Sequence, residues 1–375
     1  MPNGHRIFII DTYYGSFLSD FYKKEIQTGS MDYTSTKRLI LDQLFGTSDF
    51  FSYAFNNLGH TAEEFIVNDK IQQKKWAIEN NLKLPFIEKI GEYIPRAARY
   101  TDTYWIYPIL LAQIEKFKPD IIFNQNINFI DPHFLFEIKE KFGIKIIGQT
   151  ASRLPDGLHR KPYDLLVSSL LHYVEKFRNE GLKSEYLKLA FEPRVLSNLK
   201  KNNSPYEITH IGGYGPTHNE RNSLLEEASK KLSIDFWGYG IANVDRESPI
   251  IPKFHGSAWG TDMYTILFNS KITLTKHIEM VASKYANNMT LYEATGCGCL
   301  LITDQKENLP EILIPGKEVE TYASTDELIE KAEYYLTHEA ERLTSAKAGQ
   351  AKTGTEHNYS VRASELINII NKNLF

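Results

Sequence analysis

A glycine-rich segment in the second half of the chain carries residue types that suit phosphate binding. Residues 211–221 read Ile-Gly-Gly-Tyr-Gly-Pro-Thr-His-Asn-Glu-Arg. Gly212 and Gly213 let the backbone approach a ligand, and His218 and Arg221 stand where a helix is expected to begin. Arginine suits phosphate oxygens because its planar fork donates parallel hydrogen bonds. The spacing is not that of a dinucleotide fingerprint, and an ordinary turn explains the glycines equally well.

Two basic residues, Lys276 and His277, follow the apolar run Lys271–Thr275, which we expect to be a strand. Ligands of doubly wound sheets bind beyond the carboxyl ends of the strands. A lysine and a histidine at this place can neutralise a pyrophosphate. A solvated lysine and a structural histidine form the alternative.

A short helix followed by a buried strand is predicted for residues 287–304. Asn288 is a suitable N-cap, Asn287 and Met289 flank it, and Glu293 lies about one turn further on. A phosphate near the helix start and the Glu293 carboxylate would together suit the diphosphate and the ribose hydroxyls of a nucleotide. An ordinary helix–strand unit with a solvated glutamate remains the alternative.

Three residues of the first half are candidates for acid–base catalysis on a hydroxyl group. Asp11 follows the expected first strand, and Asp156 and His159 follow a later one. Aspartate is also common in turns for purely local hydrogen-bonding reasons.

Neither a metal site nor a disulfide is indicated. The two cysteines, Cys297 and Cys299, are two residues apart on the turn into a buried strand, which favours small buried thiols in a reducing compartment. We found no cluster of His, Cys and carboxylates with metal-ligand spacing. We therefore expect no metal and no other cofactor.

The composition predicts an ordinary globular protein. The chain has 375 residues, of which 42% are hydrophobic and 24% charged, and its net charge is −4. The absence of a basic block argues against nucleic acid as a partner. No signal peptide and no apolar run of about 20 residues is visible, so a cytoplasmic protein without a transmembrane segment is expected.

Strand-like and helix-like segments alternate through the whole chain, which predicts α/β domains with parallel, doubly wound sheets. The polar segment 197–205 interrupts the alternation, which then restarts. We expect an N-terminal domain at 1–196, a C-terminal domain at 206–356 and a last helix within 357–375. In the first domain, Tyr33–Asn57 is expected to be one helix, or two helices broken at Gly46.

Residues 286–298 (Ala-Asn-Asn-Met-Thr-Leu-Tyr-Glu-Ala-Thr-Gly-Cys-Gly), with Pro315-Gly316-Lys317-Glu318-Val319 and His357-Asn358-Tyr359, resemble the C-terminal domain of CgeB-like glycosyltransferases. The loop with His218 and Arg221 also follows the pattern of that family. The resemblance covers most of residues 206–365 and is diffuse in the first domain.

The resemblance implies a GT-B architecture, in which two Rossmann-like domains face each other across a cleft. The second domain would hold the sugar nucleotide, the first the acceptor, and the last helix would cross back to the first. Glu293 would bind the ribose hydroxyls, Asn288 and Met289 would lie near the phosphates, and no metal would be needed. Tyr285 and Thr290 depart from the pattern of related enzymes, which often carry a glutamate and a basic residue there.

The leading hypothesis is transfer of a sugar from a nucleoside diphosphate sugar to a hydroxyl acceptor. The acceptor would be a surface polysaccharide, a lipid-linked glycan or a glycoprotein, with peripheral membrane association as an option. A sugar-nucleotide epimerase or hydrolase of the same fold is one alternative. A non-catalytic nucleotide-sugar-binding partner of a synthase complex is another, because Tyr285 and Thr290 depart from the pattern.

Overall fold

The computed structural model describes residues 4–84, 105–154, 160–203, 205–278 and 284–375. The chain forms two compact units. The first consists of Met1–Ser168, His172–Tyr186 and Ala363–Phe375, and the second of Ser169–Leu171 and Leu187–Arg362.

The main passage between the units lies at Tyr186 and Leu187, earlier than the polar segment 197–205 in which we expected it. Backbone pairing explains the difference. The N–H of Phe191 donates to the carbonyl of His357, and the N–H of Tyr359 donates to the carbonyl of Phe191. These bonds fix the stretch after residue 186 within the second unit.

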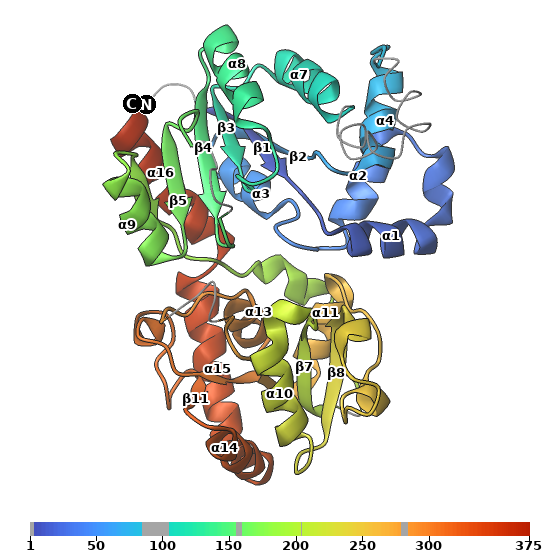
Figure 1. Ribbon diagram of the computed structural model, residues 1–375, viewed down its shortest axis with the longest axis vertical. Coiled ribbons are helices and arrows are strands. Elements are labelled where there is room, and N and C mark those ends of the chain that lie inside the picture. The colour runs from blue at the N-terminus through green and yellow to red at the C-terminus, as the bar shows by residue number, and fades with distance from the viewer. Residues whose placement is uncertain (1–3, 85–104, 155–159, 204, 279–283) are drawn as a thin grey trace. The chain divides into compact units, whose positions relative to one another are not determined.

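The described residues of the first unit form a six-stranded, fully parallel sheet in the order β2-β1-β3-β4-β5-β6 (Figure 1). Its strands are β1 (Arg6–Asp11), β2 (Thr61–Ile66), β3 (Ile121–Asn124), β4 (Lys145–Thr150), β5 (Leu165–Ser168) and β6 (Ser184–Tyr186). Its helices are α1 (Gly15–Lys24), α2 (Tyr33–Leu41), α3 (Phe50–Asn57), α4 (Lys70–Glu79), α7 (Ile106–Phe117), α8 (Pro132–Phe142) and α9 (Leu171–Asn179), with a 3-10 turn at Ile26–Ser30.

Both faces of the first sheet are covered, as the unbroken apolar run of β1 predicts. Phe8 and Ile10 point to a core cluster that includes residues of α7 and α8, whereas Ile7 and Ile9 alternate to the opposite face, and all four are fully buried. The segment expected to be one or two helices is two, α2 and α3, and Gly46 lies between them with a positive φ of 64°.

The described residues of the second unit form a five-stranded parallel sheet in the order β11-β10-β9-β7-β8. Its strands are β7 (Tyr206–Gly213), β8 (Ile234–Tyr239), β9 (Ser270–Leu274), β10 (Leu300–Asp304) and β11 (Glu320–Tyr322). Because β8 and β9 flank β7 on opposite sides, the direction of winding reverses at β7. The carboxyl edge at such a reversal is where ligands of open α/β sheets bind.

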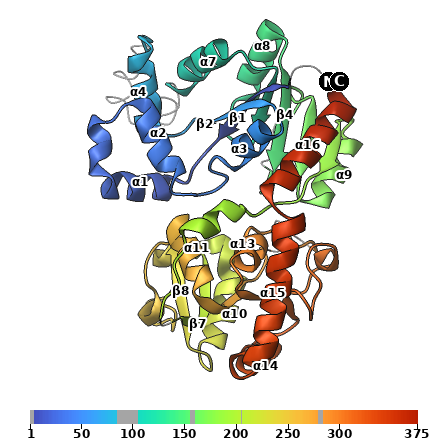
Figure 2. The same cartoon turned by 180° about the vertical axis from the view of Figure 1, so that it is seen from behind.

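Helices cover both faces of this sheet. They are α10 (Asn219–Ala228), α11 (Thr261–Phe268), α13 (Thr290–Gly296), α14 (Thr325–Thr337) and α15 (Glu339–Glu356), with 3-10 turns at Pro193–Asn198, Pro216–His218, Ile241–Asn243, Ile251–Lys253 and Leu309–Glu311. Helix α10 lies on one face and α11 and α13 on the other (Figures 1 and 2). The core on the α10 face joins residues of the strands with Leu225 of α10 and Leu328 of α14.

The last helix, α16 (Tyr359–Leu374), belongs to both units. It begins in the second unit, and its residues from Ala363 onward belong to the first. At its end the side-chain amide of Asn371 lies 3.2 Å from the Nε2 atom of His5, and the ring of Phe375 stacks on His5. The N- and C-terminal segments of the chain thus meet within the first unit.

Candidate functional site

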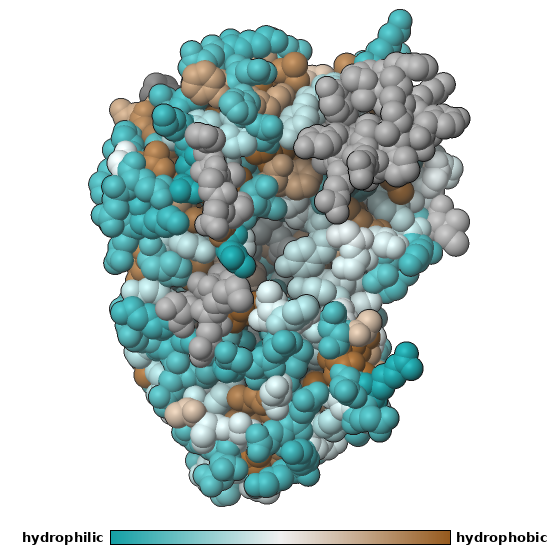
Figure 3. Space-filling model, viewed as in Figure 1, coloured by the Kyte–Doolittle hydropathy of each residue, from teal (hydrophilic) through white to brown (hydrophobic). Residues whose placement is uncertain are grey.

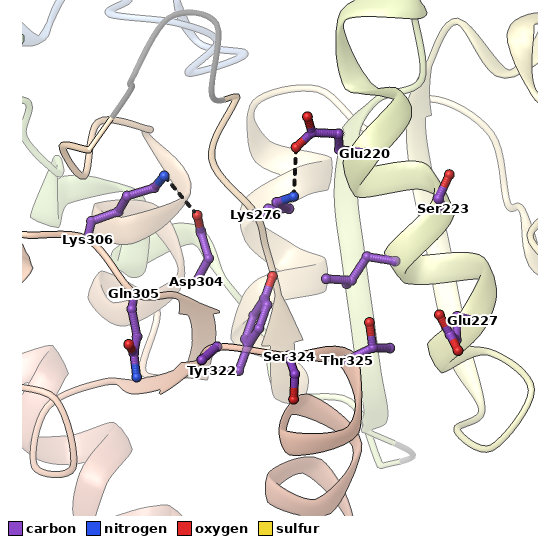
Figure 4. A pocket seen from close by; sticks show the side chains of 12 residues that line it. Glu220, Ser223, Glu227, Lys276, Asp304, Gln305, Lys306, Tyr322, Ser324 and Thr325 are labelled. Carbon is purple, nitrogen blue, oxygen red and sulfur yellow. Dashed lines mark hydrogen bonds and ion pairs between the residues drawn. The ribbon is translucent and has the colours of Figure 1, made fainter.

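A pocket of about 730 Å³ opens at the carboxyl edge of the second sheet (Figure 4). It lies beyond β9, β10 and β11, on the side of α10 and α14. Its lining consists of Glu220, Ser223, Leu224, Glu227, Lys276, Asp304, Gln305, Lys306, Tyr322, Ala323, Ser324 and Thr325. Nearly all of these side chains are polar, and Figure 3 shows a largely hydrophilic surface on this side of the second unit. The pocket therefore suits a hydrophilic ligand.

Two ion pairs stand in the pocket. The Nζ of Lys276 lies 2.9 Å from a carboxylate oxygen of Glu220, and the Nζ of Lys306 lies 3.3 Å from Oδ2 of Asp304 (Figure 4). Lys306 also lowers the pKa of Glu220, after the larger effects of the hydrogen bond and the charge of Lys276. The four residues thus form one electrostatic network around the pocket.

Asp304 holds a second basic residue, His277. Its Oδ1 accepts the backbone N–H of His277 at 2.9 Å and lies 2.7 Å from the imidazole Nδ1. Burial disfavours ionisation of Asp304, but the contacts with His277 and the charge of Lys306 outweigh it and lower the pKa of Asp304 to about 2. The carboxylate is therefore ionised at neutral pH.

The two glycines at the end of β7 are required by close packing. A Cβ atom on Gly213 would lie 2.8 Å from the ring of Tyr239 and 3.0 Å from the Nε2 atom of His218. A Cβ on Gly212 would lie 2.9 Å from the Nε2 atom of His210. The absence of side chains at Gly212 and Gly213 therefore lets Tyr239, His218 and His210 pack against the backbone.

Arg221 is buried under this backbone. Its guanidinium donates to the carbonyl oxygen of Gly213, and its Nε has no hydrogen-bond partner among the described residues. Burial lowers the pKa of Arg221. The structure thus brings Gly212, Gly213, His218 and Arg221 together.

Two histidines beside Arg221 are held neutral. Burial, followed by the charge of Arg221, lowers the pKa of His210 to about 3 and that of His218 to about 4. Nδ1 of His210 bonds to the carbonyl oxygen of Leu274 at 2.8 Å, whereas its Nε2 and the Nδ1 of His218 are buried without a partner in the described chain. No carboxylate among the described residues pairs with any of the three bases. Such a basic cluster suits an anion.

Glu293 is a carboxylate without a partner among the described residues. Burial in α13 raises its pKa to about 7. Asn287, Asn288 and Met289 directly precede this seven-residue helix, and the Asn288 side chain accepts the N–H of Leu291 at 3.0 Å, so Asn288 caps the helix start. No residue of α13 lines the pocket around Lys276. Glu293 therefore does not line this pocket.

The candidate base of the first unit, Asp11, ends β1. Its carboxylate accepts the hydroxyl of Thr47 and the backbone N–H of Thr12, each at 2.7 Å. Burial raises the pKa of Asp11 to about 6, although both hydrogen bonds oppose the shift. The other two candidates, Asp156 and His159, lie outside the described residues.

Several residues of the site escaped the sequence reasoning. His210 lies inside a strand, where its type reads as structural. Asp304 and Glu220 were visible as a strand end and a helix start, but their pairing with His277 and Lys276 depends on which elements are neighbours. The pairing of β9 with β10 was the missing information.

The described residues contain no group of three or more His, Cys, Asp or Glu side chains that could hold a metal ion. Within the same residues, no helix has the length and apolar character needed to cross a membrane.

The sequence of the second unit matches a known family. Residues 221–368 match the family described as glycosyl transferase-like, which covers α10 to most of α16. No curated protein sequence matches the chain.

The fold matches solved structures over nearly the whole chain. A glycosyltransferase from Rickettsia africae is 12% identical, with 99% of each chain covered and a TM-score of 0.58. The Anabaena protein HepE in complex with UDP-glucose is 10% identical, with 98% of this chain and 99% of that chain covered and a TM-score of 0.57. Sucrose-phosphate synthase from Thermosynechococcus elongatus is 11% identical, covers 78% of this chain and 80% of that chain, and has a TM-score of 0.52.

These neighbours and the two parallel sheets identify the fold as GT-B. Together with the family match, they support a glycosyl transfer function.

Proposed function

We propose that this protein is a glycosyltransferase that takes a sugar from a nucleoside diphosphate sugar, which the second unit binds at the carboxyl edge of its sheet. One observation carries the proposal. The edge where β7 reverses the winding holds Arg221 and two histidines that pair with no carboxylate among the described residues, and Lys276 and Lys306 line the pocket at the same edge. A buried basic cluster of this kind calls for an anionic ligand.

The residues have distinct proposed roles. Arg221, helped by Lys276, neutralises the diphosphate, and the neutral His218 can donate a hydrogen bond to it, while Gly212 and Gly213 let the ligand approach the backbone. Glu293 accepts hydrogen bonds from the ribose hydroxyls, which would give its carboxylate the partners it lacks. Asn287, Asn288 and Met289 border the same helix and complete the proposed contact region.

The transfer itself breaks the bond between the anomeric carbon and the diphosphate oxygen, and the electron pair leaves with the diphosphate. A bond from the acceptor hydroxyl to the same carbon forms, and the hydroxyl proton passes to a base. We assign Asp11 as the candidate base, because its raised pKa of about 6 lies near the pH at which it would work. Cationic side chains at the departing diphosphate would stabilise the developing charge.

Two finer assignments are part of the proposal. The CgeB-like subgroup is supported by the segment around Glu293 and by the loop of His218 and Arg221. UDP is the first nucleotide to test, because HepE of the same fold was solved with UDP-glucose. A glycan, a lipid-linked saccharide or a glycoprotein remains the proposed class of acceptor.

Metal-independent catalysis is also proposed, because Arg221, Lys276 and Lys306 can supply the charge that a divalent cation would otherwise provide. Release of UDP from UDP-glucose should be unchanged, within about twofold, after dialysis against EDTA. A loss of turnover that Mg²⁺ or Mn²⁺ restores would contradict this assignment.

A thermal-shift panel with UDP, GDP, dTDP, CDP and CMP tests the proposed function. A nucleotide present at 100 times its dissociation constant should stabilise the protein by about 2.7 kcal/mol. A shift with one diphosphate and none with CMP is the expected result. If no nucleotide shifts the unfolding midpoint, the proposal of a sugar-nucleotide site fails.

A further inference from the structure

We propose that His277 donates a hydrogen bond from Nε2 to the diphosphate of the bound sugar nucleotide, and that Asp304 positions the imidazole for it. The inference rests on the proposed function and deepens it, because it names a contact to the leaving group and the residue that orients it.

The orientation of His277 is fixed by two contacts to one oxygen. Oδ1 of Asp304 receives the backbone N–H of His277 at 2.9 Å and lies 2.7 Å from Nδ1 of its ring. The hydroxyl of Thr303 also donates to this oxygen, at 3.2 Å. The two residues follow or end the neighbouring parallel strands β9 and β10, so the contact is built into the sheet.

The charge of Asp304 fixes the tautomer of His277. An ionised carboxylate only accepts hydrogen bonds, so Nδ1 of His277 must carry a hydrogen. Asp304 does not determine whether Nε2 of His277 also carries a hydrogen. In the imidazolium form both ring nitrogens carry a hydrogen, and Nε2 then donates to an acceptor.

Nδ1 of His277 has a hydrogen-bond partner in Asp304, whereas Nε2 has none among the described residues. The His277 side chain is fully buried. An unpaired buried polar group is costly, and each such exception in a folded protein calls for an explanation. His277 is not among the residues that line the pocket, so a ligand acceptor would have to enter beside Lys276 to reach Nε2, while the Asp304 contact on Nδ1 could stay in place.

The surroundings favour an anion as that acceptor. Lys276 precedes His277 directly, and Lys306 holds the other oxygen of Asp304 at 3.3 Å. Both lysines and Asp304 line the pocket. A phosphate in the pocket would replace Glu220 and Asp304 as the partner of the two lysines, whereas a neutral hydroxyl would compete poorly with those carboxylates.

The contact should matter most during transfer. As the bond to the anomeric carbon breaks, negative charge grows on the diphosphate oxygens and a donor aimed at them binds more strongly. We therefore expect a larger effect on kcat than on KM when Asp304, the positioning residue, loses its charge.

Two substitutions of His277 separate its two nitrogens. His277→Asn keeps a side-chain N–H near the place of Nδ1 and removes Nε2, whereas His277→Gln keeps an N–H near the place of Nε2. With inorganic pyrophosphate and UDP as probes in calorimetric titrations of the full chain, His277→Asn should bind both about tenfold more weakly. His277→Gln should stay within about threefold of wild type, and uridine should bind all three proteins alike.

Asp304→Asn provides an independent measurement. It keeps an oxygen for the His277 N–H groups but removes the charge, so UDP release from UDP-glucose should lose about tenfold or more in kcat with KM changed less than about threefold. Wild-type pyrophosphate affinity in His277→Asn would overturn the proposal. So would equal losses in His277→Asn and His277→Gln accompanied by a lower unfolding midpoint, because the ring would then be only structural.

Nucleotide binding by the wild-type protein and by the variants shows whether a negative result refutes this inference or the proposed function. If the His277 variants do not fold, Asp304→Asn decides, and unchanged pyrophosphate affinity and kcat in it overturn the role of the pair. A wild-type protein that binds neither UDP nor any other nucleotide of the panel refutes the proposed function itself. A wild-type protein that binds UDP, with variants that bind it equally well, refutes only the role of His277.

Discussion

The carboxyl edges of the two sheets have the same architecture but carry different buried ionisable groups. In the first unit the edge carries buried acids, Asp11 and Asp69, and burial raises the pKa of each to about 6. In the second unit it carries buried bases, His210 and His218, whose pKa values burial lowers to about 3 and about 4.

The two edges also differ in the hydrogen-bond partners of their ionisable side chains. Asp11 and Asp69 receive hydroxyl and amide donors, such as the Thr47 hydroxyl at 2.7 Å and the Tyr22 hydroxyl at 2.6 Å. Among the described residues, Arg221 donates only to the backbone carbonyl of Gly213. One edge therefore suits a hydroxyl compound that loses a proton, and the other an anion. Two copies of one fold can thus be specialised for the two substrates of a transfer by the choice of a few buried side chains.

Asp11→Asn should produce the largest change if the acidic edge supplies the base. We expect kcat for sugar transfer or UDP release to fall about 10²- to 10⁴-fold, because the amide cannot accept the proton. The affinity for UDP, measured by calorimetry, should stay within about twofold. Asp69→Asn is the matched control, since Asp69 is equally buried at the same edge. Turnover reduced to the same extent in both variants would remove Asp11 from the reaction.

Arg221→Ala should have the next largest effect and tests the basic edge. Loss of a charge-assisted contact should weaken UDP binding about 10- to 100-fold, while uridine, which has no phosphate, should bind almost as before. Arg246→Ala removes an exposed arginine of the same unit and should change neither affinity. Equal losses for UDP and uridine would mean that Arg221 supports the fold of the loop and does not bind phosphate.

Much of this contrast was predictable from the sequence. Apolar runs such as Ile7–Ile10 predicted the buried parallel strands, and the pair Gly212-Gly213 indicated a close approach to the backbone, where only glycine permits the packing that the structure shows. These features depend on neighbours along the chain, which a sequence displays directly.

Other features depend on contacts between distant segments and could not be predicted. The passage between the units lies at Tyr186 because Phe191 pairs with His357 and Tyr359, which no local composition reveals. Likewise, Asp304 became part of the site only through its bond to His277, and His210 only through burial beside Arg221. Electrostatic partners are set by tertiary structure, so local sequence gives the candidate residues but not their charge states.

Glu293 differs from the bases of the second unit, since it is a partly buried acid with a raised pKa. Its folded pKa of about 7 lies above the ordinary unfolded value of about 4.3, so stability is fully present below pH 4.3 and is lost as the pH rises through 7. Glu293→Gln should remove this dependence and raise the free energy of unfolding at pH 8 by up to about 3 kcal/mol.

Urea denaturation at pH 5 and pH 8 measures this difference. The same variant should bind UDP about tenfold more weakly, while pyrophosphate binding should stay unchanged, because the carboxylate is assigned to the ribose. Leu291→Val, in the same helix, is a control for packing. A variant with wild-type pH dependence and wild-type UDP affinity would leave Glu293 as an ordinary helix residue.

Glu220→Gln should have the smallest effect and the opposite sign. Glu220 pairs with Lys276 at 2.9 Å although its own side chain is 66% exposed, so its carboxylate competes with an incoming phosphate for the lysine. Removing that charge should tighten UDP binding about two- to fivefold, in line with the small energies of exposed ion pairs, and the gain should shrink in high salt. Glu227→Gln, which lines the same pocket on the same helix, should leave the affinity unchanged. Weaker binding in Glu220→Gln would mean that Glu220 itself contacts the ligand.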